Sequence, residues 1–175
     1  MTPWWPGEQW GLHGGLARET GFTFVTGDRL DVDQRGVNFF VGCAPPKKFG
    51  SATFYSGAYR DRTGALLDGG GVYHLHVPPD PPVRQFWSVS VYASDTQAFV
   101  RDSPRQSIDS YDDEVEKNAD GSLEIYFGPE PPEGKQANWI YTPPGANWWT
   151  YFRFYGPKPA VQDKSWRLPD IERIG

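Results

Sequence analysis

The sequence predicts an all-β protein, a jelly-roll-like antiparallel β-sandwich with short helical turns in its connections. The 175 residues include 20 glycines and 17 prolines, a composition typical of many short strands joined by tight turns. Residues 86–92 alternate in a way that places Trp87, Val89 and Val91 on one face of a strand. Residues 148–155 are aromatic on both faces, which favours a strand in the middle of a packed sheet.

The segment 148–155 organises the rest of the chain, and its two faces differ by one charge. Alternation assigns Trp148, Thr150, Phe152 and Phe154 to one face, and Trp149, Tyr151, Arg153 and Tyr155 to the other. Large aromatic side chains are mostly buried, so one interpretation is that both faces are core. The alternative is that the face carrying Arg153 lines a pocket. Both interpretations stay open at this point.

Length and charge limit the classes of function. The chain is long enough for one domain with a real core. The net charge is −5 and no run of Lys or Arg is dense, so we expect no nucleic-acid partner. No stretch of about 18 apolar residues and no signal peptide is present, which predicts a soluble chain without a membrane partner and leaves its location unknown. Cys43, the single cysteine, is expected to be a small core residue.

The first residues form a distinct arm. Residues 1–21 contain Trp4, Trp5 and Trp10 among glycines and prolines, without the period of a strand or a helix. We therefore divide the chain into a Trp-rich arm, 1–21, and a single β-sandwich domain, 22–175. The indoles need a surface to cover them, and three surfaces are open: the sandwich itself, a second subunit of a homo-oligomer, or a partner domain.

The remaining elements follow from alternation and turn residues. A polar loop that contains Asp68 closes as a hairpin, one helical turn begins at Ser110, and the tail has Trp166 as its one anchor. The predicted strands are residues 22–25, 37–41, 51–60, 72–77, 86–92, 98–101, 122–127, 138–141 and 148–155.

Two places in the sequence resemble part of a metal site, and we expect no metal at either. His74 and His76 lie on one face of a strand, as the first two ligands of a cupin-type site do, but prolines break the chain where an acidic ligand would follow. The acids between the first two strands lack the glycine and the distal glutamate of a calcium loop. We expect no cofactor.

Several motifs occur in one order and resemble the domain-of-unknown-function family 1214. They are residues 82–92, 109–112, 117–122, 137–139, 152–157 and 166–169. In that family this domain commonly follows a domain of family 1254, which is absent from this chain. The resemblance implies a jelly-roll-like sandwich and supplies no established reaction.

The polar residues of these motifs and their neighbours are the candidate ligand-binding site: Arg105, Asp109, Tyr111, Asn138, Trp139 and Arg153. If folding brings them together, they suit a small polar ligand, a sugar or a carboxylate, because Arg pairs with anions and an indole stacks on C–H faces. The competing interpretation is structural: the arginines satisfy Asp109 or loop carbonyls and Asn138 pins a turn.

Three classes of function remain. The first is a ligand-binding or scaffold domain without chemistry of its own, because the sequence has no nucleophile elbow and no phosphate loop. The second is a hydrolase or lyase with Asp109 or Asp112 as base and Tyr111 or Arg153 polarising the substrate. The third is an interaction subunit that docks through its Trp-rich arm. Carboxylates paired with arginines would favour the first, and a shielded carboxylate in a pocket the second.

Overall fold

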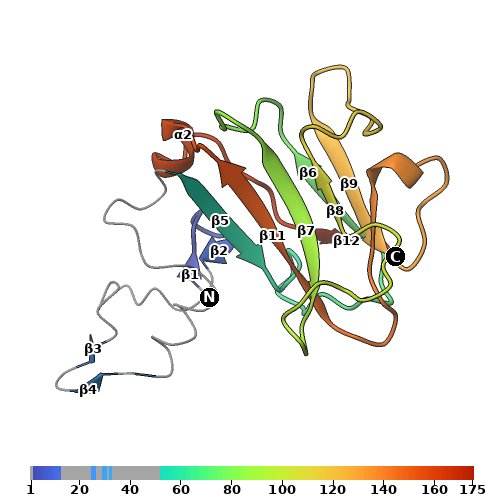
Figure 1. The fold of residues 1–175 in the computed structure, drawn as a ribbon, viewed down its shortest axis with the longest axis horizontal. Coiled ribbons are helices and arrows are strands. Elements are labelled where there is room, and N and C mark those ends of the chain that lie inside the picture. The colour runs from blue at the N-terminus through green and yellow to red at the C-terminus, as the bar shows by residue number, and fades with distance from the viewer. Residues whose placement is uncertain (1, 13–24, 27–28, 31, 33–51) are drawn as a thin grey trace.

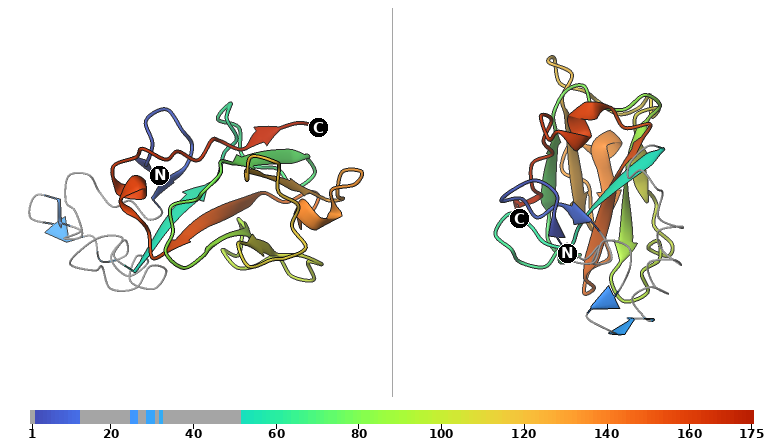
Figure 2. Two further views of the ribbon diagram at one scale, coloured as in Figure 1. Left: turned by 90° about the horizontal axis from the view of Figure 1, so that it is seen from above. Right: turned by 90° about the vertical axis from the view of Figure 1, so that its left-hand side faces the viewer.

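Strands dominate the computed structural model, which describes residues 2–12, 25–26, 29–30, 32 and 52–175. Two sheets face each other (Figures 1 and 2), as expected for an all-β sandwich. The larger sheet has the order β1 (Thr2–Pro3), β2 (Gly11–Leu12), β5 (Thr53–Ala58), β11 (Trp148–Tyr155), β7 (Trp87–Ala93) and β8 (Ser107–Asp109). The smaller has the order β10 (Trp139–Tyr141), β9 (Leu123–Gly128), β6 (Tyr73–Val77) and β12 (Glu172–Arg173).

The other described elements are short. A separate two-stranded ribbon consists of β3 (Val25–Thr26) and β4 (Arg29–Leu30). The 3₁₀ helix η1 (Gln136–Asn138) precedes β10, and the helix α2 (Pro159–Gln162) follows β11. No helix in the described ranges is long and apolar enough to cross a membrane. Cys43, the acids Asp28, Asp31 and Asp33, and the predicted strand 37–41 lie outside the described residues.

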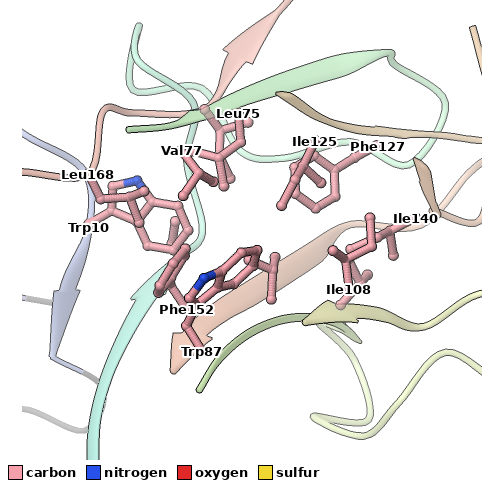
Figure 3. Close-up of a cluster of buried hydrophobic side chains, with 14 of the residues drawn as sticks. Trp10, Leu75, Val77, Trp87, Ile108, Ile125, Phe127, Ile140, Phe152 and Leu168 are labelled. Atoms are coloured by element: carbon pink, nitrogen blue, oxygen red, sulfur yellow. The ribbon is translucent and has the colours of Figure 1, made fainter. Parts of the chain in front are cut away.

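Strand β11 occupies the centre of the larger sheet, as the sequence predicts. It pairs antiparallel with β5 on one side and with β7 on the other. Its inner face is core: Trp148, Phe152 and Phe154 are at most 1% exposed. The inner faces of β6 and β9 contribute Leu75 and Ile125, which lie opposite Phe152 and Trp87 across the space between the sheets (Figure 3). We call the face turned away from the smaller sheet the outer face.

Three local expectations are wrong, one strand was not predicted, and one strand pairs in an unexpected direction. Residues 61–71 are no hairpin loop, because β5 and β6 belong to different sheets and the loop crosses between them. Residues 98–101 make one isolated bridge, Tyr92 with Phe99, rather than a strand. The residues after Ser110 form turns without a helix. Strand β8 was not predicted, since its three residues are too few to show a period. Strand β10 also departs from antiparallel pairing, because it runs parallel to β9.

The arm packs on the chain's own tail. Trp5 and Trp10 are fully buried, and their indole Nε1 atoms donate to the carbonyls of Trp166, at 3.0 Å, and Pro169, at 2.8 Å. Nε1 of Trp4 donates to the carbonyl of Val161 at 3.0 Å. The indoles therefore pack on the chain's own domain, which is the first of the three surfaces named above.

The tail is more deeply anchored than its sequence indicates. Val161, Leu168 and Ile171 are fully buried, whereas Trp166, the one expected anchor, is partly exposed. Figure 3 shows Leu168 beside Trp10 at one end of the core. These apolar positions are separated by polar residues and do not recur with the period of a strand or a helix, so the sequence gives no pattern that predicts their burial.

Candidate functional site

A row of polar side chains crosses the outer face of the larger sheet. Arg153 on β11 is paired with Tyr55 on β5 and with Ser88 on β7, and Ser88 is paired with Asp109 on β8. Directly paired residues point to the same face of a sheet, so these four side chains share the outer face. We call Tyr55, Arg153, Ser88 and Asp109 the polar row.

Arg153 is partly buried and is held by β7. Its Nη1 donates to Oγ of Ser90 at 2.8 Å, and its Nη2 donates to the hydroxyl of Tyr92. The guanidinium carbon lies 5.4–5.5 Å from the ring centres of Tyr55, Tyr92 and Tyr151, within the range of cation–π attraction. The guanidinium therefore leans from β11 towards Ser90 and away from Ser88.

This cation has no carboxylate partner within the described part of the chain. Burial lowers the pKa of Arg153 from its usual value, while Coulomb interaction with Tyr155 and Tyr55 raises it. A guanidinium stays charged in proteins, so the site retains a positive charge that is partly removed from water. A guanidinium has five N–H groups, of which those directed at Ser90 and Tyr92 have described partners.

Tyrosine hydroxyls near Arg153 keep their protons. Burial raises the pKa of Tyr151, with smaller contributions from Tyr59 and Tyr55. Burial also raises the pKa of Tyr155, although Arg153 acts in the opposite direction. These hydroxyls therefore present neutral donor and acceptor groups at neutral pH, and Arg153 carries the charge of the cluster.

Aromatic rings border the polar row. On one side Phe86 stacks on Tyr155, with ring centres 4.0 Å apart, and lies 5.3 Å from the ring of Tyr111. On the other side Trp149 stacks on Tyr92 at 4.5 Å, and Tyr92 stacks on Phe99 at 4.7 Å. The outer face thus has a polar strip between two apolar borders.

Three of the six predicted site residues share this face. Arg153 and Asp109 belong to the polar row, and Tyr111, 67% exposed, lies in the first aromatic border. Oδ1 of Asp109 accepts a hydrogen bond from the backbone N–H of Tyr111 at 2.8 Å. Tyr111 in turn places its hydroxyl 3.4 Å from the carbonyl of Gln85, to which it donates.

The other three predicted residues lie elsewhere and have structural partners. Arg105 is ion-paired with Asp112 and donates to the carbonyl of Gln136 at 3.4 Å. Asn138, 3% exposed, accepts from the backbone N–H of Glu116 and donates to its carbonyl and to that of Glu124. Trp139, on β10 of the smaller sheet, donates from Nε1 to the carbonyl of Gly128 at 3.0 Å. None of these three side chains has a described contact with Arg153.

A second polar cluster lies on the smaller sheet and was missed. Glu124 on β9 contacts Nε2 of His74 with one carboxylate oxygen, and its other oxygen lies 2.7 Å from Nδ1 of His76. Burial acts to raise the pKa of Glu124, but the hydrogen bonds to His76 and His74 give a net lowering. Both histidines are partly exposed on one face of the sheet. Only the register of His76 with Glu124 could reveal this contact.

Metal ligation is not supported by this arrangement. Each oxygen of Glu124 is occupied by one imidazole nitrogen, and no group of three or more His, Cys, Asp and Glu side chains in the described ranges could hold a metal ion.

Together, the fold and the site define a two-layer all-β domain with a partly buried cation on the outer face of one sheet. The chain belongs to the family described as "Protein of unknown function (DUF1214)", whose model matches residues 52–159. That range contains the whole polar row.

A solved structure supports the fold. The VPA0106 protein from Vibrio parahaemolyticus is 24% identical, with a TM-score of 0.65, over 91% of this chain and 41% of that chain. An uncharacterized protein from Burkholderia cenocepacia is 21% identical, with a TM-score of 0.43, over 73% of this chain and 31% of that chain. This chain therefore spans less than half the length of both proteins. A search of functionally curated proteins found no match.

Proposed function

We propose that this domain binds a small carboxylate ligand, with Arg153 as the anchor. The observation that carries the proposal is a partly buried guanidinium that has no carboxylate partner in the described part of the chain. Partial removal of a cation from water costs free energy unless an anion compensates it. A ligand carboxylate would supply this compensation.

The surroundings favour a carboxylate over a neutral ligand. Arg pairs with planar carboxylates through two parallel N–H donors. The bonds to Ser90 and Tyr92 fix the orientation of the guanidinium before a ligand arrives, which reduces the entropy lost on binding. The hydroxyl of Tyr155, whose pKa is raised by burial, lies near Arg153 and adds a neutral group that can share in the anion's hydrogen bonds.

The contacts of Asp112 count against this residue as the base of the hydrolase or lyase alternative. Asp112 is ion-paired with Arg105, and its Oδ1 accepts from the backbone N–H of Glu114 at 3.2 Å. The carboxylate of Asp112 is therefore occupied by structural contacts. The described carboxyl whose pKa is raised, Asp170, contacts the arm rather than the polar row.

The test is thermal denaturation with acetate and succinate, at constant ionic strength, of the wild type, Arg153→Gln and Arg62→Gln. A ligand at about 100 times its Kd should add roughly 2.7 kcal/mol to the free energy of unfolding. We expect a rise in Tm that disappears in Arg153→Gln. Arg62→Gln removes the same charge from an exposed ion pair with Glu172 and should keep the rise. Equal rises in both variants would contradict the proposal.

A further inference from the structure

We infer that the ligand is a hydroxylated carboxylic acid of sugar size, oriented by Arg153 at its acid end and by Asp109 at its hydroxyl end. This inference rests on the proposed function of Arg153 and adds the identity of the second recognition group. Its basis is the register of three adjacent strands, which aligns Arg153, Ser88 and Asp109 on one face.

The spacing of the row sets the length of the ligand. Neighbouring strands are about 4.8 Å apart, so the backbones at Arg153 and Asp109 are separated by about 10 Å. A two-carbon acid held at Arg153 would not extend to Asp109. A six-carbon sugar acid, with its carboxylate at one end and hydroxyls along the chain, spans such a gap when side chains reach in from both sides.

Asp109 offers an acceptor for hydroxyl groups. Its Oδ1 accepts from the backbone of Tyr111, while no described Arg or Lys is ion-paired with it. A carboxylate is purely an acceptor, and hydrogen bonds to a charged acceptor are stronger than those between neutral groups. Sugar hydroxyls supply the donors that its other oxygen can use.

Ser88, a short side chain that is 9% exposed, occupies the middle of the row between Arg153 and Asp109. Because the guanidinium of Arg153 leans to Ser90 and Tyr92, it does not bond to the hydroxyl of Ser88, and no other described side chain does so. Phe86 borders the same stretch through its contacts with Tyr155 and Tyr111. A small hydroxyl beside aromatic rings suits a ligand with alternating hydroxyl groups and C–H faces.

The experiment is isothermal titration calorimetry with glucuronate, acetate and glucose, on the wild type and Asp109→Asn. The asparagine keeps an oxygen for the N–H of Tyr111, so the turn is preserved. For the wild type we expect glucuronate to bind at least tenfold more tightly than acetate, and glucose to give no measurable heat. Asp109→Asn should weaken glucuronate about tenfold and leave acetate unchanged.

Two outcomes separate this inference from the proposed function. If glucuronate and acetate bind equally and Asp109→Asn changes neither, the inference is overturned while carboxylate binding at Arg153 stands. If neither acid binds the wild type, the proposed function fails and the inference fails with it. Ser88→Ala is a second variant, and we expect it to weaken glucuronate and not acetate.

Discussion

Arg153 and Ser90 lie on neighbouring strands and are joined by a hydrogen bond of 2.8 Å from Nη1 to Oγ. Their backbones are not direct partners, because Ser90 is in register with Tyr151 and Arg153 with Ser88. The bond therefore runs diagonally across the sheet and fixes the direction of the guanidinium. Tyr92 receives a second bond from the same group, so two residues of β7 determine where the charge lies.

Tyr92→Phe should remove one of the contacts that orient Arg153 without changing the charge of the guanidinium. The variant removes the acceptor of Nη2 and leaves the ring stack with Trp149 in place. We expect a loss of about 1 kcal/mol in the free energy of unfolding, measured by urea denaturation. Tyr111→Phe is the control, because its exposed hydroxyl makes one long contact with Gln85, and it should change stability by less than about 0.5 kcal/mol. Equal losses in the two variants would show that Tyr92 does not hold Arg153.

Asn138→Ala should be strongly destabilising. The side chain is buried and makes three hydrogen bonds of 2.8–2.9 Å with the backbones of Glu116 and Glu124. Its removal leaves three backbone groups without partners, which should cost about 3 kcal/mol in urea denaturation. The exposed Asn118 bonds Ser122 and Glu124 through Nδ2, and Asn118→Ala should cost less than about 1 kcal/mol. A small effect of Asn138→Ala on stability would return this residue to the list of ligand-binding candidates.

Asp170 should make the stability of the fold depend on pH. Burial raises the pKa of Asp170 from 3.8 to about 6, the hydrogen bond from the backbone of Gln9 lowers it, and Glu8 raises it. Between these two pH values the folded state holds a proton that the unfolded state has lost. Stability attributable to this group is therefore fully present below about pH 4 and is lost as the pH rises through about 6.

Asp170→Asn should remove this loss. The amide oxygen can still accept from the N–H of Gln9, which lies 2.6 Å from Oδ1 in the wild type. We expect the variant to be more stable than the wild type by roughly 1–2 kcal/mol at pH 7.5 and nearly equal to it at pH 4. Urea denaturation at both pH values is the measurement. A variant that is less stable at pH 7.5 would show that the negative charge of Asp170 stabilises the fold.

Trp10→Ala should test whether the arm is packed on its own chain. Trp10 is fully buried and its Nε1 donates to the carbonyl of Pro169, so truncation should cost about 3–5 kcal/mol. Trp10→Phe keeps an aromatic ring, loses the hydrogen bond and should cost less. For an arm docked within one chain, the Tm of the wild type is independent of protein concentration. A Tm that rises with concentration would favour docking of Trp4, Trp5 and Trp10 on a second subunit.

Sequence reasoning was reliable where alternation is long. Residues 86–92 and 148–155 each show several periods of a strand, and the structure places Trp87 and Phe152 inward and Ser90 and Arg153 outward as expected. Face assignments therefore follow from local pattern. They also identified Arg153 as the charged member of its face.

Register and long-range pairing could not be obtained in this way. The pairs of Ser88 with Arg153 and Asp109, and of His76 with Glu124, depend on which strands are neighbours. A single sequence holds no local signal for that choice. For the same reason Asn138 was grouped with Arg153 although its partners are Glu116 and Glu124, because residue type alone does not distinguish a ligand-binding amide from one that satisfies a loop.

The packing of the arm on the tail affects the protein during its synthesis. Trp4, Trp5 and Trp10 bond to residues 157–161 positions later in the chain. While the ribosome is still translating the domain, these three indoles have no carbonyls to reach and their apolar rings remain uncovered. Contacts of such long separation form late and slowly, and uncovered apolar surface promotes aggregation. The nascent arm is therefore a segment at which we expect a chaperone to act, until residues 161–169 have left the ribosome.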